Sequence, residues 1–328
     1  NALSEETYSN CKISVTDNAS NTSDNLSVSS FTIDTTAPTL AEVTAVINPT
    51  NDNTPSYTFS SNEAGDITYG GGCSSTSTNA SAANNEVTFN ALADAYYSNC
   101  TVKVTDNASN ESNTISLSSF IIDTISPTVS SVSSSIANGS YKANVNITIT
   151  ASFSEIVFVD NSSGNPRIQL ETGTNDRYAN YVSGNSTETL SFLYTVQSGD
   201  TTSDLDYKAT NSLSLNSGTI SDNITGSPNN ATLTLSSPGA SGSLGANKAI
   251  VIDTTAPTVD NVSSSTTDGN YFPDDNITVM VTFSENMIVD NSSGNPRIQL
   301  ETGSNDRYAN YISGNSTSIL SFLYAVQS

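Results

Sequence analysis

The carboxylates of this chain are the side chains whose type and spacing could support chemistry. The 328 residues include 32 Asp and Glu against 9 Lys and Arg, and no His, which gives a net charge of −23. One Asp recurs in three copies of a ten-residue phrase, "FTIDTTAPTL" at 31–40, "FIIDTISPTV" at 120–129 and "IVIDTTAPTV" at 250–259. Clustered carboxylate and amide oxygens suit a hard cation such as Ca²⁺. The lack of His excludes His-dependent triads and His metal sites.

Several other functions have little support in the residues. Carboxylate pairs serve glycoside hydrolysis, but here the acidic residues recur along the chain in loops instead of gathering in one cleft, and there is no Trp. The glycine-rich "YGGGCSS" precedes neither a helix nor a lysine, so it is a turn and not a phosphate loop. The acidic balance disfavours nucleic acid and anionic lipid, and no apolar run approaches the ~20 residues of a membrane span. We expect a chain that is not an enzyme.

Two repeat periods organise the chain. A period of 89 residues relates "NALSEETYSNCKISVTDNASN" at 1–21 to "NALADAYYSNCTVKVTDNASN" at 90–110. A period of 130 residues relates "VDNSSGNPRIQLETG" at 159–173 to an identical copy at 289–303. Tandem copies are typical of repeat proteins. The predicted domains are the end of a short module (1–37), a complete short module (38–126), a complete long module (127–256) and the first half of a second long module (257–328).

In this interpretation both ends of the sequence fall inside a module. Asn1 looks like a start in mid-sequence, and Ser328 corresponds to Ser198, which is mid-module. A half-sandwich leaves its apolar face and its edges open. We therefore expect 1–36 and 257–328 to lack strands that they need to fold fully alone.

Apolar residues alternate along strand-length runs. In "VNITITASF" at 145–153, every second residue is apolar, from Val145 to Phe153. Similar runs recur between turns rich in Asn, Gly, Ser and Asp, and no capped helical pattern accompanies them. Alternation with a period of two predicts half-buried strands. The sequence therefore predicts an all-β fold of Greek-key or meander β-sandwiches.

The pattern "VTDNASN … FTIDTTAPT" resembles the tandem bacterial Ig-like domains of giant surface proteins and adhesins. The long module, with "ASFSEIVFVDNSSGNPRIQLETG", is similar to a second Ig-like repeat of the same proteins, so the resemblance covers essentially the whole chain. It implies tandem Ig-like sandwiches in an elongated extracellular array whose role is reach and attachment. The Pro of each repeated phrase fixes φ and favours an extended residue before it, which predicts a short stiff joint.

The resemblance also implies a place where the acidic residues meet. An Ig-like sandwich brings the incoming linker, the B–C loop and the F–G loop to one pole, so carboxylates from three segments should converge there. We predict Ca²⁺ at each joint; the alternative is a solvated acidic rim, since loops such as "DNAS" are also ordinary Asx turns. The predicted ligands are Asp34, Glu63, Asp106 and Asn107 at the first joint, Asp123, Glu155 and Asp222 at the second, and Asp253 and Glu285 at the third, with Asp268, Asp274 and Asp275 nearby.

The three cysteines suggest one disulfide. Cys11 and Cys100 occupy the same position in successive short modules. Strands C and F are neighbours in an Ig-like sheet, so the resemblance implies a Cys73–Cys100 bridge, with the partner of Cys11 upstream. Such a bridge belongs to an oxidising compartment. The alternative is two buried free thiols.

The most specific stretch of the long module is "NPRIQLETG … NDRYANYVSGN". Its Arg167, Arg177, Tyr178 and Tyr181 could form a ligand surface. The plainer interpretation is structural, with Ile168 and Leu170 in a core strand and the arginines paired with Glu171 or Asp176.

The function that these observations favour is a structural extender, or stalk, of a secreted or cell-surface adhesin-like protein. Its partners would be the neighbouring modules, and a surface glycan or protein would bind outside this segment. The first alternative is a ligand-binding Ig-like module that grips a glycan or protein through the long repeat. The second is a filament subunit whose incomplete ends receive strands from a neighbour.

Overall fold

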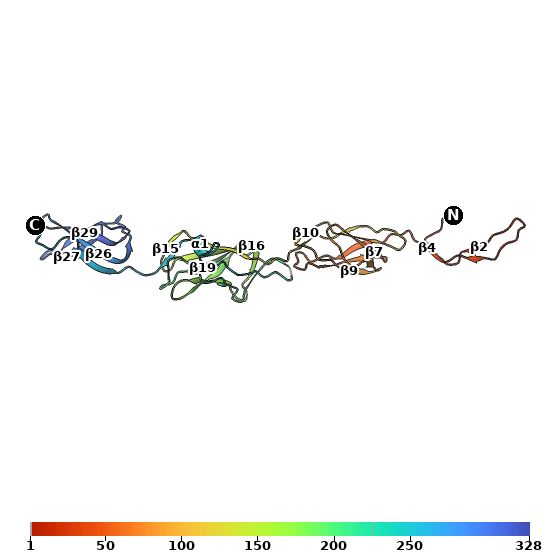
Figure 1. Ribbon diagram of the computed structural model, residues 1–328, viewed down its shortest axis with the longest axis horizontal. Helices are drawn as coiled ribbons and strands as arrows, with labels where there is room; N and C mark the ends of the chain where they lie inside the picture. Colours follow the sequence, from red (N-terminus) through yellow and green to blue (C-terminus); the bar gives the residue numbers. More distant parts are fainter. Residues whose placement is uncertain (1, 225) are drawn as a thin grey trace. The chain divides into compact units, whose positions relative to one another are not determined.

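The protein is described by a computed structural model, which covers residues 2–224 and 226–328. The predicted all-β fold is confirmed, because strands form nearly all of the regular structure. The one helix in the described part of the chain is α1 (Leu244–Asn247) (Figure 1). No helix among these residues has the length and apolar character needed to span a bilayer.

The chain divides into two compact units. Unit 1 comprises Asn1–Val196 and Thr202–Ile252, and unit 2 comprises Gln197–Thr201 and Asp253–Ser328. The main boundary, between Ile252 and Asp253, falls inside the third copy of the repeated phrase.

The first part of unit 1, up to residue 37, forms two small antiparallel pairs. These are β1 (Glu6–Tyr8) with β4 (Phe31–Ile33), and β2 (Lys12–Ile13) with β3 (Leu26–Ser27). Its apolar side chains remain accessible: Phe31 is 37% exposed, whereas Phe120, at the same place in the next repeat, is fully buried. Phe120 stacks on Phe89, a residue with no counterpart in 1–37. Without such a partner, the first segment buries little apolar surface.

The short module is a sandwich of two sheets. One sheet has the order β5-β6-β9, the other has the order β12-β11-β7-β8, and β10 pairs with β13 beside them. In the second sheet β7 pairs with β11, although β8, β9 and β10 lie between them in the sequence. This pairing is the Greek-key arrangement of an Ig-like sandwich. The strands are β5 (Leu40–Thr44), β6 (Ser56–Ser61), β7 (Gly65–Gly70), β8 (Asn79–Ala80), β9 (Asn84–Thr88), β10 (Ala95–Tyr97), β11 (Thr101–Thr105), β12 (Ile115–Ser116) and β13 (Phe120–Ile122).

Alternate residues of these strands form the core of the short module. Tyr57 and Phe59 of β6 face Val102 and Val104 of β11 across a core that also includes Phe120, and all are nearly fully buried. The intervening residues face outward, as a period of two requires. Strand ends and their loops therefore lie at the poles of the sandwich.

The long module is larger. Its main sheet has the order β14-β16-β19-β18-β17-β21, with β22 also on β17 and β23 on the far end of β16; a second sheet has the order β15-β24-β20. The strands are β14 (Val129–Ser134), β15 (Gly139–Tyr141), β16 (Asn146–Asp160), β17 (Arg167–Glu171), β18 (Arg177–Ser183), β19 (Thr187–Thr195), β20 (Thr201–Thr202), β21 (Asp206–Tyr207), β22 (Leu213–Ser214), β23 (Thr219–Ser221) and β24 (Ile250–Asp253).

Strand β16 is the longest strand of the long module and lies in its main sheet. Its alternating residues from Ile147 to Phe153 are buried, which confirms the predicted parity. The register against β19 shifts between Ser152 and Val157, and beyond this irregularity Phe158 pairs with β23 instead. Such irregularities change the direction of a strand, and this one lies beside Glu155.

Unit 2 is built on one sheet with the order β25-β26-β29-β28-β27. The strands are β25 (Val259–Ser264), β26 (Asn276–Met287), β27 (Arg297–Leu300), β28 (Arg307–Ser313) and β29 (Thr317–Ala325). This order repeats β14-β16-β19-β18-β17 of the long module, with the same irregularity after Thr282.

Candidate functional site

Three carboxylates meet where the first linker reaches the short module. One oxygen each from Asp34, Glu63 and Asp106 lies within 4.8 Å of the others. Asp34 follows β4, Glu63 lies between β6 and β7, and Asp106 follows β11. Asp106 is buried and the other two are partly buried. The structure thus brings together three of the four residues predicted for this joint.

A tight loop after β11 fixes Asp106. Its Oδ1 accepts hydrogen bonds from the main-chain N–H groups of Ala108 and Asn110, both at 2.8 Å. Its Oδ2 accepts a third from Nδ2 of Asn110 at 2.9 Å. Burial alone raises the pKa of Asp106, but these hydrogen bonds, with one from Ser109, outweigh it and hold the pKa below its ordinary value. Asp106 is therefore ionised at neutral pH.

Asn110 joins this loop to the incoming linker. The same Nδ2 that binds Asp106 donates to the main-chain oxygen of Asp34 at 3.2 Å. On the upstream side, Oε1 of Glu5 accepts from the N–H of Thr35 at 2.8 Å and from Oγ1 of Thr36 at 2.6 Å. The linker is thus held by side chains from both flanking segments.

The start of the short module is fixed in the same region. The side-chain amide of Asn113 exchanges two hydrogen bonds with the main chain of Leu40, at 2.9 and 3.1 Å. Pro38, between the linker and β5, is buried. Hydrogen bonds therefore fix the main chain immediately after the proline at which the sequence predicted a stiff joint.

The second joint, between the short and the long module, repeats this arrangement. Asp222 accepts from the N–H groups of Ile224 at 3.1 Å and Asn229 at 2.9 Å. Nδ2 of Asn229 donates to Oδ2 of Asp222 at 2.6 Å and to the main-chain oxygen of Asp123 at 3.0 Å. Asn229 therefore stands in the place of Asn110, although their loops differ in length.

The carboxylates of the second joint also interact with one another. Burial raises the pKa of Glu155 above its ordinary value, and the negative charges of Asp123 and Asp222 raise it further. These groups border a hollow of about 470 Å³, lined on one side by Pro49 and Ile121 of the short module. Asp123 and Asp222 therefore lie close enough to act on Glu155, but these three carboxylates do not form a cluster as tight as that of the first joint.

The upstream contact is also repeated. Asp94, which aligns with Glu5, accepts a hydrogen bond from Oγ1 of Thr124 at 2.9 Å. In addition, Nδ2 of Asn51 donates to Oδ1 of Asn229 at 3.2 Å. Each of the two linkers in unit 1 is thus bound by an acidic side chain before it and an asparagine after it.

The remaining predicted ligands lie elsewhere. Asn107 is exposed, and it is Asn110 of the same loop that contacts Asp106 and the linker main chain. In unit 2, Asp253 accepts from the N–H of Thr255 at 3.0 Å and Glu285 lies near the end of β26; neither belongs to a cluster of three acidic side chains among the described residues. The expectation that Asp268, Asp274 and Asp275 lie near Glu285 is wrong, because these residues precede β26 and Glu285 is close to its other end.

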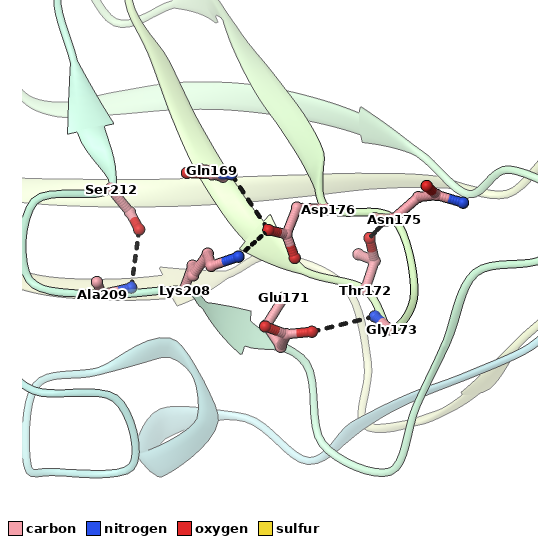
Figure 2. Close-up of polar contacts among 9 residues, drawn as sticks. All are labelled: Gln169, Glu171, Thr172, Gly173, Asn175, Asp176, Lys208, Ala209 and Ser212. Atoms are coloured by element: carbon pink, nitrogen blue, oxygen red, sulfur yellow. Dashed lines mark hydrogen bonds and ion pairs between the residues drawn. The ribbon is translucent and has the colours of Figure 1, made fainter.

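The arginine and tyrosine residues of the long module make packing contacts. The guanidinium carbon of Arg167 lies 4.0 Å from the centre of the Tyr178 ring, and Tyr181 packs edge-to-face on Phe192. Asp176 accepts one hydrogen bond from Nζ of Lys208 and another from Nε2 of Gln169 (Figure 2). Arg177 lies in β18, opposite Leu170 of β17.

The predicted disulfide is confirmed. Cys73 and Cys100 are bonded, with their Cα atoms 5.2 Å apart. The bridge lies beside the pairing of β7 with β11, which are neighbours as the Ig-like prediction required. Cys11 is a partly buried free thiol.

Sequence reasoning missed the side chains that bind the linkers. Asn110 and Asn21 align at the 89-residue period, as do Asp94 and Glu5. That recurrence was visible, but Asn110 binds a main-chain oxygen, and the two acidic residues bind hydroxyl and N–H groups of linker threonines. Their type therefore gave no sign of a partner.

Comparisons with known proteins identify no family. No family model matches the chain, and no curated protein matches it. Among solved structures, the chain is similar to the full extracellular region of plexin A4, domains 1 to 10, with 11% sequence identity and a TM-score of 0.19. The match covers 89% of this chain and 21% of that one. At that TM-score it carries no functional meaning, so the function is inferred from the geometry of the joints.

Proposed function

We propose that this chain is a spacer segment of a secreted or cell-surface adhesin-like repeat protein. Its modules would hold an adhesive or anchoring end at a distance, and the joints between them would resist bending. The observation that carries the proposal is the repeated contact of an asparagine with the linker main chain, Asn110 with Asp34 and Asn229 with Asp123. A spacer benefits from such contacts at its joints, because a free linker would let the modules swing.

The chemistry of the chain supports an extracellular setting. A disulfide persists in oxidising compartments and is rare in the cytosol. The excess of negative charge, −23, keeps such a chain soluble. The bacterial Ig-like resemblance belongs to this proposal and rests on the sequence patterns alone.

Calcium at the joints is the second part of the proposal. The three carboxylates of the first joint lie close enough to share one ion, and the loops that carry them contain no Lys or Arg. A hard cation would relieve their repulsion and add bonds across the linker. Isothermal titration of the 328-residue chain tests this: we expect heat from Ca²⁺ that Asp106→Asn reduces, with Mg²⁺ as the control. No binding at about 1 mM Ca²⁺ would contradict it.

The spacer role is tested against the ligand-binding alternative by arrays of glycans and of extracellular matrix proteins. A spacer predicts no saturable binding below about 100 µM. Specific binding that Tyr178→Ala or Arg167→Ala abolishes would instead favour the alternative, in which the long module grips a ligand.

A further inference from the structure

The hollow of about 470 Å³ at the second joint is built mostly by the long module. Apart from Pro49, Ile121 and Asp123, all of its lining residues belong to that module. Ligand pockets of proteins have volumes of about 300–1,000 Å³ and combine apolar walls with a few polar groups. This hollow has a volume in that range and both kinds of lining.

An irregularity in β16 shapes the hollow. The register of β16 against β19 shifts between Ser152 and Val157, and irregularities of this kind re-aim side chains. Successive residues of a regular strand point to opposite faces. Glu155 and Ile156 nevertheless both line the hollow, so one short segment supplies it with a carboxylate and an apolar wall.

The apolar walls of the hollow are open to water. Ile156 is 50% exposed and Ile121 is 39% exposed. Phe158 lies between β16 and the same hollow and is partly buried. Because removing apolar surface from water is favourable, a ligand with an apolar part would gain free energy by covering these side chains.

The same hollow gathers negative charge. Asp123, Glu155, Glu188 and Asp222 line it, and no Lys or Arg does so among the described residues. Burial raises the pKa of Glu155, and the charges of Asp123 and Asp222 raise it further. In the part of the chain that the structure describes, nothing donates a hydrogen bond to this carboxylate. A cation in the hollow would therefore relieve an unbalanced repulsion.

An arginine side chain suits this combination better than a metal ion. Ca²⁺ takes about 6–8 oxygen ligands, whereas these carboxylates do not gather as closely as those of the first joint and stand beside apolar walls. A guanidinium group is weakly hydrated, keeps its charge and presents a fork of N–H donors to carboxylates. Its aliphatic stem packs on apolar surface. The hollow therefore offers partners for both parts of an arginine.

The lining distinguishes this joint from the repeated part of the sequence. Glu155 recurs as Glu285 at the period of 130 residues, but Asn286 and Ser318 stand in the places of Ile156 and Glu188. Strands β26 and β29 of unit 2 pair with those residues present. Ile156 and Glu188 are therefore not required for this pairing of strands.

We propose that the hollow at the second joint binds an arginine side chain of a partner polypeptide. Its guanidinium group would lie among Glu155, Glu188 and Asp222, and an apolar residue beside the arginine would cover Ile156 and Ile121. The partner would be a basic chain, which the net charge of −23 attracts. This inference depends neither on the spacer role nor on calcium at the first joint.

NMR titration of the 328-residue chain, labelled at its isoleucine methyl groups, tests the proposal. The probe is acetyl-leucyl-arginine amide in calcium-free buffer with about 150 mM NaCl, which screens diffuse attraction. The methyl signals of Ile156 and Ile224 should shift and saturate with a dissociation constant of about 1 mM. The signal of Ile168, which is fully buried in the core, should stay unchanged. The probe should also lower the pKa of Glu155, read from its carboxyl carbon-13 shift.

Two variants remove the contacts without introducing a residue foreign to the fold. Ile156→Asn and Glu188→Ser carry the residues that unit 2 has at these places, and each should weaken binding about fivefold. Glu171→Ser is the matched control, because it removes the same charge from an exposed residue outside the hollow. It should leave binding unchanged, and the neutral acetyl-leucyl-glutamine amide should not saturate the shifts at about 10 mM.

Three results would overturn the proposal. The first is no saturation by the arginine probe at about 10 mM. The second is equal binding of acetyl-glycyl-arginine amide, which would show attraction of charge alone. The third is displacement of the probe by Ca²⁺ with the same methyl shifts, which would assign the hollow to a metal ion. That last result would leave the calcium proposal intact, so the two proposals fail separately.

Discussion

Replacing Asn110 with alanine tests whether the contacts at the first joint stabilise it. The substitution removes one hydrogen bond to the neutral main-chain oxygen of Asp34 and one to the ionised Asp106. A neutral bond contributes about 1 kcal/mol and one to a charged group about 2 kcal/mol, so we expect a loss of about 2–3 kcal/mol in the short module. Asp106 keeps its main-chain donors, including the N–H of residue 110 itself.

Native-state hydrogen exchange measures this loss where it occurs, which matters because a chain of several modules does not unfold in one step. The free energy of opening should fall for amides of β6 and β11, and the N–H groups of Thr35 and Thr36 should exchange faster. Asn107→Ala is the matched control, since Asn107 is an exposed residue of the same loop. It should change stability by less than about 0.5 kcal/mol.

The reasoning fails if the two variants behave alike. If Asn110→Ala destabilises the sandwich while the linker amides are unaffected, the asparagine supports only its own loop.

Three further predictions concern the Tyr57 hydroxyl, the disulfide and the Glu155 carboxylate. Tyr57→Phe should raise the free energy of unfolding of the short module by about 1 kcal/mol, because the Tyr57 hydroxyl is buried without a hydrogen-bond partner and burial raises its pKa. A lower free energy of unfolding, measured by chemical denaturation, would contradict this. Replacing Cys73 and Cys100 together by serine should lower the free energy of unfolding of the short module by about 3.5 kcal/mol, from the entropy of a loop with a sequence separation of 27. Cys11→Ser should leave the melting of the short module unchanged. Glu155→Gln should stabilise the second joint at pH 7 in calcium-free buffer. Burial and the charges of Asp123 and Asp222 raise the pKa of Glu155. Ionisation of Glu155 therefore costs the folded state free energy above that pKa, and it costs nothing below the ordinary pKa of a glutamate. Thermal melts at pH 7 and pH 3 should show the gain at pH 7 only, and an equal gain at both would refute the electrostatic cause.

The sequence predicted the parts of the fold that depend on side-chain polarity and repetition. Alternation placed Ile147, Ile149 and Ala151 in the core, and the Ig-like resemblance paired Cys73 with Cys100. The meeting of Asp34, Glu63 and Asp106 followed from the expected positions of three loops at one pole.

The parts that escaped prediction depend on atoms that every residue shares. Asn110 and Asn229 bind main-chain oxygens, which no motif distinguishes. The misplacement of Asp274 has another cause, because alternation alone does not fix the length of a strand. Strand β26 separates that residue from Glu285.

The stiffness of the joints is the central claim, and a distance distribution across the second joint tests it most directly. Spin labels on non-natural residues at the exposed positions Glu86 of β9 and Val182 of β18 would report on it by pulsed electron resonance. We predict a narrow distribution in the unmodified chain that widens in Asn229→Ala. A distribution already as wide as that of the variant would contradict the account.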